Sequence, residues 1–88
     1  MAWTIEYAET AKKQLRKLDR VAAQRIVDFM DERVAPRENP RAMGKALKGP
    51  LGDLWRYRVG DYRVICDIQD GMQTVLVLQV GNRREVYR

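Results

Sequence analysis

Three arginines in the second half of the chain are spaced to bind phosphate. Arg56 and Arg58 alternate within residues 54–59, and an extended backbone would place both side chains on one face. Arg63 follows a Gly-Asp turn, so a hairpin would bring it onto the neighbouring strand. Guanidinium groups match the oxygens of a phosphodiester. The spacing therefore predicts a phosphate-binding surface, and the other interpretation is a solvated strand face.

The C-terminal segment supplies more cations and one aromatic ring. Its members are Arg83, Arg84, Tyr87 and Arg88. If the strands form a closed meander, Arg56, Arg63 and Arg83 converge on an open surface, and the ring of Tyr87 can stack on a base beside them. Tyr87 as a core residue is the alternative. Convergent arginines beside an aromatic ring are suited to a phosphodiester ligand.

The rare residue types exclude several kinds of catalysis. The chain has no histidine and one cysteine, Cys66. Imidazole acid–base chemistry, histidine-dependent nucleophiles and the usual zinc sites are therefore excluded. Cys66 alternates with Val64 and Ile68, a pattern that predicts a buried small apolar residue. Catalysis by this chain has to use other groups.

Composition indicates one basic domain. The 88 residues are too few for two independent lobes, so a single domain over 1–88 is expected. Seventeen lysines and arginines against 12 carboxylates give a net charge of +5, which favours a polyanion or an acidic protein as partner. The first 20 residues carry no hydrophobic signal core, and no apolar run reaches the roughly 18 residues of a membrane span. We expect a cytoplasmic location.

Hydrophobic periodicity predicts an α+β fold, with two helices packed on one face of a small sheet. A basic amphipathic helix follows an N-terminal strand, and Asp19 is expected to cap a second helix. Three antiparallel strands then form a meander after one long connection. The expected elements are a strand at 2–7, helices from Ala8 and from Asp19, a loop at 36–53, strands at 54–59, 62–68 and 74–80, and a C-terminal segment that leaves the last strand at Gly81.

The exposed side of the first predicted helix is cationic. Its basic residues are Lys12, Lys13, Arg16 and Lys17. A solvated helix side is the simplest interpretation, and a supporting contact with a large polyanion is the alternative.

Three segments together resemble the RelE/ParE superfamily of toxin–antitoxin toxins: Leu47-Lys48-Gly49, WRYRVGDYRV at 55–64 and VGNRREVY at 80–87. The closing R-x-x-x-Y pattern resembles the RelE branch. This resemblance implies a compact RelE-like RNase fold and a ribosome-dependent endoribonuclease that cuts messenger RNA in the aminoacyl site. It also implies that no metal or other cofactor is needed. The implied partners are the ribosome, messenger RNA and a cognate acidic RelB-like antitoxin, which forms a hetero-oligomer with the toxin.

The resemblance also implies roles for individual residues. Arg56 matches a basic catalytic residue, Arg63 the phosphate-stabilising arginine, Arg83 the arginine of the C-terminal segment, and Tyr87 the tyrosine that stacks on or orients the nucleotide. The RNA-binding residues that we expect in addition are Lys48, Arg58, Arg84, Arg88, Lys12, Lys13 and Arg16.

Two departures from the family pattern affect the chemistry. A family lysine falls at Leu54, and the lysine expected at position 56 is arginine. Arginine stabilises a phosphorane but is a poor base. The candidates for the proton acceptor are Tyr87, Lys48 and Glu85. Two other functions stay open: a ParE-type inhibitor of DNA gyrase, and an inactive RNA- or ribosome-binding module, which the leucine at 54 favours.

Overall fold

A computed structural model describes residues 2–47 and 53–82. Its strands form one five-stranded sheet in the order β1-β5-β4-β3-β2. β1 pairs with β5 in parallel, and the other neighbours are antiparallel. The strands are β1 (Thr4–Tyr7), β2 (Lys45–Leu47), β3 (Leu54–Val59), β4 (Tyr62–Gln69) and β5 (Thr74–Asn82).

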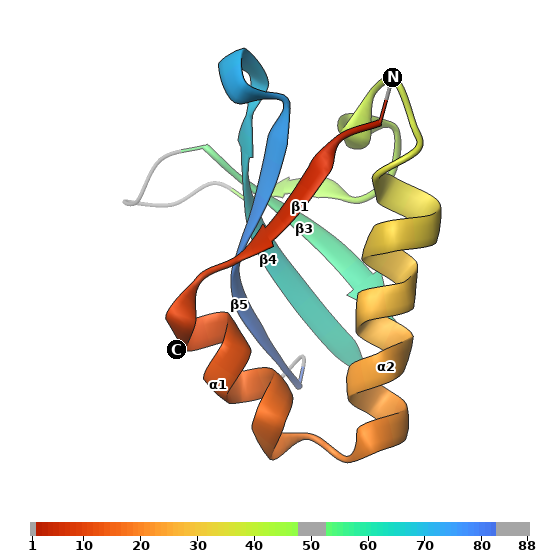
Figure 1. The fold of residues 1–88 in the computed structure, drawn as a ribbon, viewed down its shortest axis with the longest axis vertical. Coiled ribbons are helices and arrows are strands. Elements are labelled where there is room, and N and C mark those ends of the chain that lie inside the picture. Colours follow the sequence, from red (N-terminus) through yellow and green to blue (C-terminus); the bar gives the residue numbers. More distant parts are fainter. Residues whose placement is uncertain (1, 48–52, 83–88) are drawn as a thin grey trace.

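Two helices form the second layer. α1 (Glu9–Lys17) lies against β5, and α2 (Arg20–Phe29) lies beside β3 (Figure 1). The predicted α+β architecture, with both helices on one sheet face, is confirmed. Asp19 caps α2 as predicted, because its Oδ1 accepts a hydrogen bond from the Ala22 N–H at 2.7 Å. A π-helical turn, Met30–Val34, continues the helix.

The core lies between the helices and the sheet. Period-two alternation sends every second residue of β3 and β4 toward the helices. Cys66 is buried there, as its alternation with Val64 and Ile68 predicts. The helices contribute Ala11, Ile26, Met30 and Val34, and the strands contribute Tyr57, Val59, Val64, Cys66, Ile68, Val75, Val77 and Val80.

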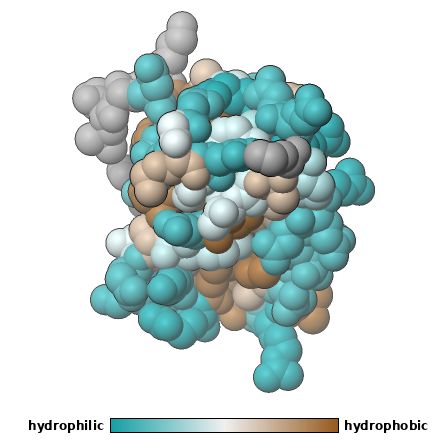
Figure 2. All heavy atoms as spheres, turned by 45° about the horizontal axis from the view of Figure 1, so that its top comes forward, coloured by the Kyte–Doolittle hydropathy of each residue, from teal (hydrophilic) through white to brown (hydrophobic). Residues whose placement is uncertain are grey.

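Few large apolar side chains remain outside this core. Val21 and Met72 are the two that are highly exposed among the described residues. Hydrophilic residues predominate over the side of the molecule shown in Figure 2, and hydrophobic residues occupy smaller areas between them. No helix within residues 2–47 and 53–82 combines the length and the apolar character that crossing a bilayer requires.

A bulge in β5 is tied to α1. The pairing between β4 and β5 shifts register between Ile65 and Cys66, which interrupts the backbone ladder at this point. The N–H of Val80 donates to the side-chain oxygen of Gln14 at 2.6 Å. A polar residue of α1 therefore satisfies a backbone donor near the bulge and fixes the helix on the sheet.

The connection predicted as a loop at 36–53 contains regular structure, so that prediction is wrong in part. A 3₁₀ turn at Pro40–Ala42 precedes β2. β2 has only three residues and no apolar alternation, and its existence depends on pairing with β3. The last strand also runs to Asn82 instead of ending at Val80.

We expect the protein to lose stability in alkaline solution, because burial raises the pKa of two tyrosines and one cysteine. Burial is the main cause that raises the pKa of Tyr7 from 10.0 to about 12, and it raises the pKa of Cys66 and Tyr57 as well. The unfolded chain releases these protons at lower pH than the folded chain. The folded state therefore binds more protons in alkaline solution, and the free energy of unfolding falls as pH rises.

We expect Tyr7→Phe to lessen this fall between pH 10 and pH 12, because the variant lacks the hydroxyl that titrates there. Urea unfolding of both proteins from pH 7 to pH 12 measures the effect. An identical slope for the two proteins over that interval would contradict the prediction.

Candidate nucleic-acid interface

The sheet face opposite the helices carries a cluster of cations. Arg58 of β3 is directly opposite Arg63 of β4. One step along β3, Arg56 is opposite Lys45 of β2 on one side and Ile65 of β4 on the other. Directly paired residues point to the same face of a sheet. Two successive pairs of like charge therefore lie side by side, and we call Lys45, Arg56, Arg58 and Arg63 the cationic face.

Like charges that are directly opposed across strands destabilise a sheet. The β5 residues in the same rows are Gln79 and Gly81, which carry no charge to offset the cations. Asp67 lies two positions past Ile65 on β4, where its carboxylate accepts a hydrogen bond from the Gln69 side chain at 3.2 Å. This arrangement is suited to a polyanion that lies across the strands.

Ile65 forms an apolar floor beneath the cationic face. It is only 4% exposed, yet it lies on the face opposite the helices and is not part of the core cluster. Arg56 and Arg63 are half-buried, whereas Arg58 and Lys45 are exposed. The long stems of arginine pack well over apolar surface while their guanidinium groups stay near water. The site therefore combines positive charge with a rigid apolar surface beneath it.

A hollow of about 230 Å³ opens at the edge of β3, beyond the first residue of β2. It brings three members of the cationic face together with two aromatic rings. The ring centroids of Phe29 and Tyr57 are 6.0 Å apart in an edge-to-face arrangement. The residues that line the hollow are Phe29, Met43, Gly44, Lys45, Arg56, Tyr57 and Arg58.

The aromatic residues of β3 hold the connection in place. Tyr57 is buried and donates its hydroxyl hydrogen to the Pro40 carbonyl at 2.6 Å. The indole N–H of Trp55 donates to the Met43 carbonyl at 2.7 Å. These two bonds fix the segment that leads into β2, and so they position Lys45. The predicted separation of these rings from the arginines on alternate sides of the strand is confirmed.

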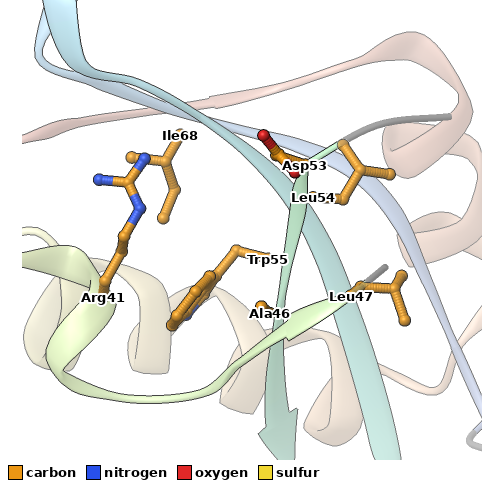
Figure 3. Close-up of a pocket in the computed structure, with 7 residues that line it drawn as sticks. All are labelled: Arg41, Ala46, Leu47, Asp53, Leu54, Trp55 and Ile68. Atoms are coloured by element: carbon orange, nitrogen blue, oxygen red, sulfur yellow. The ribbon is translucent and has the colours of Figure 1, made fainter. Parts of the chain in front are cut away.

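A second hollow, of about 270 Å³, lies at the other end of β2 (Figure 3). Its lining is mainly apolar, and Trp55 lies between Arg41 and Ala46 in this view. The Arg41 guanidinium makes two hydrogen bonds of 2.9 Å to the Asp70 carboxylate. This ion pair raises the pKa of Arg41 and lowers the pKa of Asp70. The cation in this hollow is therefore already neutralised by an ion pair within the protein.

The structure brings some of the predicted residues together. Arg56, Arg58 and Arg63 share one sheet face, as their spacing predicts. Lys12, Lys13 and Arg16 are exposed on α1, in the helical layer, and Lys12 lies 3.5 Å from the Glu9 carboxylate. The predicted site residues outside the described range are Lys48, Arg83, Arg84, Tyr87 and Arg88, together with the candidate base Glu85.

Sequence reasoning missed Lys45. This residue fell inside the predicted loop, where no periodicity gave it a face. Only its pairing with Arg56 places it beside the arginines.

Comparison with known proteins gives the class of the protein. The sequence model of the family described as ParE toxin of type II toxin-antitoxin system, parDE, matches residues 5–87. The chain is therefore a toxin of a type II toxin–antitoxin system.

Individual relatives agree with this assignment. Toxin RelG of Mycobacterium tuberculosis is 31% identical over 88 residues, which cover 100% of this chain and 99% of that protein. Toxin RelE of the same organism is 34% identical over 79 residues, or 90% of this chain and 79% of that protein. A chain of the M. tuberculosis toxin–antitoxin complex RelBE2 superposes with a TM-score of 0.85 at 28% identity, covering 97% of this chain and 95% of the other. The chain belongs to the RelE/ParE superfamily, with relatives in its RelE branch.

Proposed function

We propose that this protein is a cytoplasmic, ribosome-dependent endoribonuclease that cuts messenger RNA without a metal ion and is held inactive by an acidic RelB-like antitoxin. The observation that carries the proposal is the cationic face. Two of its four members, Arg56 and Arg63, are arginines that the family motif and the spacing both single out. The relatives named RelG and RelE support the RelE type of activity.

The arginines are suited to one part of the cleavage. Attack by a ribose 2′-hydroxyl creates a phosphorane with two negative charges. Arg56 and Arg63 lie diagonally across β3 and β4, and diagonal neighbours in a sheet are roughly 7–8 Å apart at Cα. Two guanidinium groups can therefore approach one phosphate from two sides. Arg83 and Tyr87, by their match to the family motif, complete the proposed site.

The open shape of the site supports dependence on the ribosome. The cationic face is a sheet surface beside a hollow of about 230 Å³, and a flexible messenger on such a surface would have to be held in line for attack. In-line geometry is worth many kcal/mol in such reactions. The ribosome would supply that geometry in its aminoacyl site. We expect little or no cleavage of free RNA.

An acidic antitoxin is supported by charge. The chain carries +5, and four of its cations are grouped on one sheet face. A disordered acidic segment can fold onto such a surface and neutralise it. Several solved neighbours are toxin–antitoxin complexes, among them the intact E. coli RelBE complex, which superposes with a TM-score of 0.63 at 25% identity.

Inhibition of DNA gyrase is the second candidate function, because the matching family is described as ParE. One experiment separates the two candidates. The purified toxin is incubated with programmed ribosomes, with the free messenger, and with gyrase and supercoiled DNA. We expect primer extension to show cuts only when ribosomes are present. Gyrase-dependent DNA breaks with intact messenger would reject the nuclease, and neither effect would favour a binding module without chemistry.

A further inference from the structure

We propose that Lys45 is the proton donor for the leaving group in messenger cleavage, a role that rests on the proposed function. Lys45 begins β2 and is directly opposite Arg56. It is a diagonal neighbour of Arg58 across the same strand pair. It also lines the hollow at the edge of β3 with both arginines. The strand register and the lining of the hollow therefore both place Lys45 beside the arginines of the cationic face.

The chemistry of the step requires a group that can release a proton. The 2′-hydroxyl loses its proton to solvent while its oxygen forms a bond to phosphorus. The bond from phosphorus to the 5′-oxygen then breaks, and that oxygen takes a proton from the Lys45 ammonium. The products are a 2′,3′-cyclic phosphate, a free 5′-hydroxyl and a neutral amine, which water protonates again. No oxidant, reductant or further reactant is needed.

The neighbouring arginines are unsuited to this role. A guanidinium group holds its proton throughout the accessible pH range, whereas an ammonium group on a flexible stem can release one. Arg56, Arg58 and Arg63 therefore supply charge, and a different residue has to supply the proton. Position 54, where the family pattern has a lysine, is leucine here.

Within residues 2–47 and 53–82, Lys45 is the residue on the cationic face that can release a proton. The other lysines within residues 2–47 are Lys12, Lys13 and Lys17, and all three lie on α1 in the helical layer. The described tyrosines belong to the helix side of the sheet. Asp67, on the cationic side, is a carboxylate that accepts a hydrogen bond from the Gln69 side chain.

The position of Lys45 is held by the fold. Its strand is anchored at one end by the two aromatic hydrogen bonds to Pro40 and Met43. Gly44 passes so close to β3 that a Cβ atom there would lie 2.3 Å from the Arg56 carbonyl oxygen. The backbone beside Lys45 is therefore fixed against β3. A lysine whose backbone is held in place, and whose long side chain can reach the substrate, is suited to proton transfer.

The test compares Lys45→Arg, which keeps the positive charge, with the wild-type protein on programmed ribosomes. General acid catalysis typically contributes ~10²–10⁴-fold, so we expect single-turnover cleavage by Lys45→Arg to fall at least ~100-fold. The matched control is Arg20→Lys at the start of α2, which also keeps the positive charge, and we expect it to cleave at the wild-type rate. Thermal unfolding establishes that both variants are folded.

A messenger with sulfur in place of the 5′-oxygen at the cut site gives the second readout. Sulfur is a good leaving group without protonation. We therefore expect Lys45→Arg to cut this messenger at nearly the wild-type rate. A variant that cuts the ordinary messenger normally, or that stays slow on both messengers, would overturn the role of Lys45 and leave the nuclease intact. No cuts by the wild-type protein would reject the nuclease itself, and the role of Lys45 with it.

Discussion

Arg63→Gln is expected to reduce ribosomal cleavage of messenger RNA by ~10²–10³-fold, the usual effect of removing one preorganised group that stabilises transition-state charge. Arg63 is half-buried in β4, directly opposite Arg58, above the apolar floor of Ile65. Its position is therefore fixed before the messenger arrives. Glutamine keeps a polar side chain but removes the positive charge. Single-turnover cleavage, read by primer extension, measures the loss.

The control for this variant is Arg20→Gln. Arg20 is an exposed arginine at the start of α2, in the helical layer, so its loss changes the net charge equally without touching the cationic face. We expect the cleavage rate of Arg20→Gln to lie within about twofold of the wild-type rate, since a single distant charge is largely screened at physiological salt. Equal losses in the two variants would show that net charge matters and that the site at Arg63 does not exist.

Gly44→Ala is expected to lower the free energy of unfolding by about 3 kcal/mol or more. Gly44 has a φ of +81°, a conformation that an L side chain adopts only with strain. The added Cβ would also lie 2.3 Å from the Arg56 carbonyl oxygen and 2.8 Å from the Trp55 indole nitrogen. The strand β2 would have to move away from β3. Chemical denaturation measures the change.

Gly71→Ala is the matched control for that substitution. No heavy atom lies within 4 Å of a Cβ built at Gly71, and its backbone is not in the left-handed region. Alanine there should leave the protein as stable as wild type or stabilise it by ~0.4–1 kcal/mol, through the entropy of the unfolded chain. A Gly44 variant as stable as the Gly71 variant would mean that β2 is not packed on β3 as described.

Periodicity was sufficient to predict the layers of the fold. The helix stripes, the Asp19 cap and the alternation in β3 and β4 are local signals, because each is repeated over several residues of one element. The alternation assigned Arg56 and Arg58 to one face correctly, and the Gly-Asp turn placed Arg63 on the neighbouring strand. These predictions needed no knowledge of distant contacts.

The parts that sequence reasoning missed depend on contacts between distant segments. β2 has three residues, too few for a pattern, and forms because β3 offers it a free edge. Lys45 acquires a neighbour only through that pairing. The change from α-helical to π-helical geometry at Met30 has no sequence signal that we can identify. Short elements and edge residues are therefore where tertiary structure decides the outcome.

The parallel pairing of β1 with β5 joins segments that are far apart in the sequence, and this affects when the sheet can form during synthesis. Thr4 is paired with Thr74, and Tyr7 with Val77, so β1 has no neighbour in the sheet until residues 74–77 have been made. Contacts so distant in sequence form late, because closing a long loop carries an entropic cost. A nascent chain that has not yet extended through β5 therefore lacks its finished sheet, and β1 stays an unpaired segment until then.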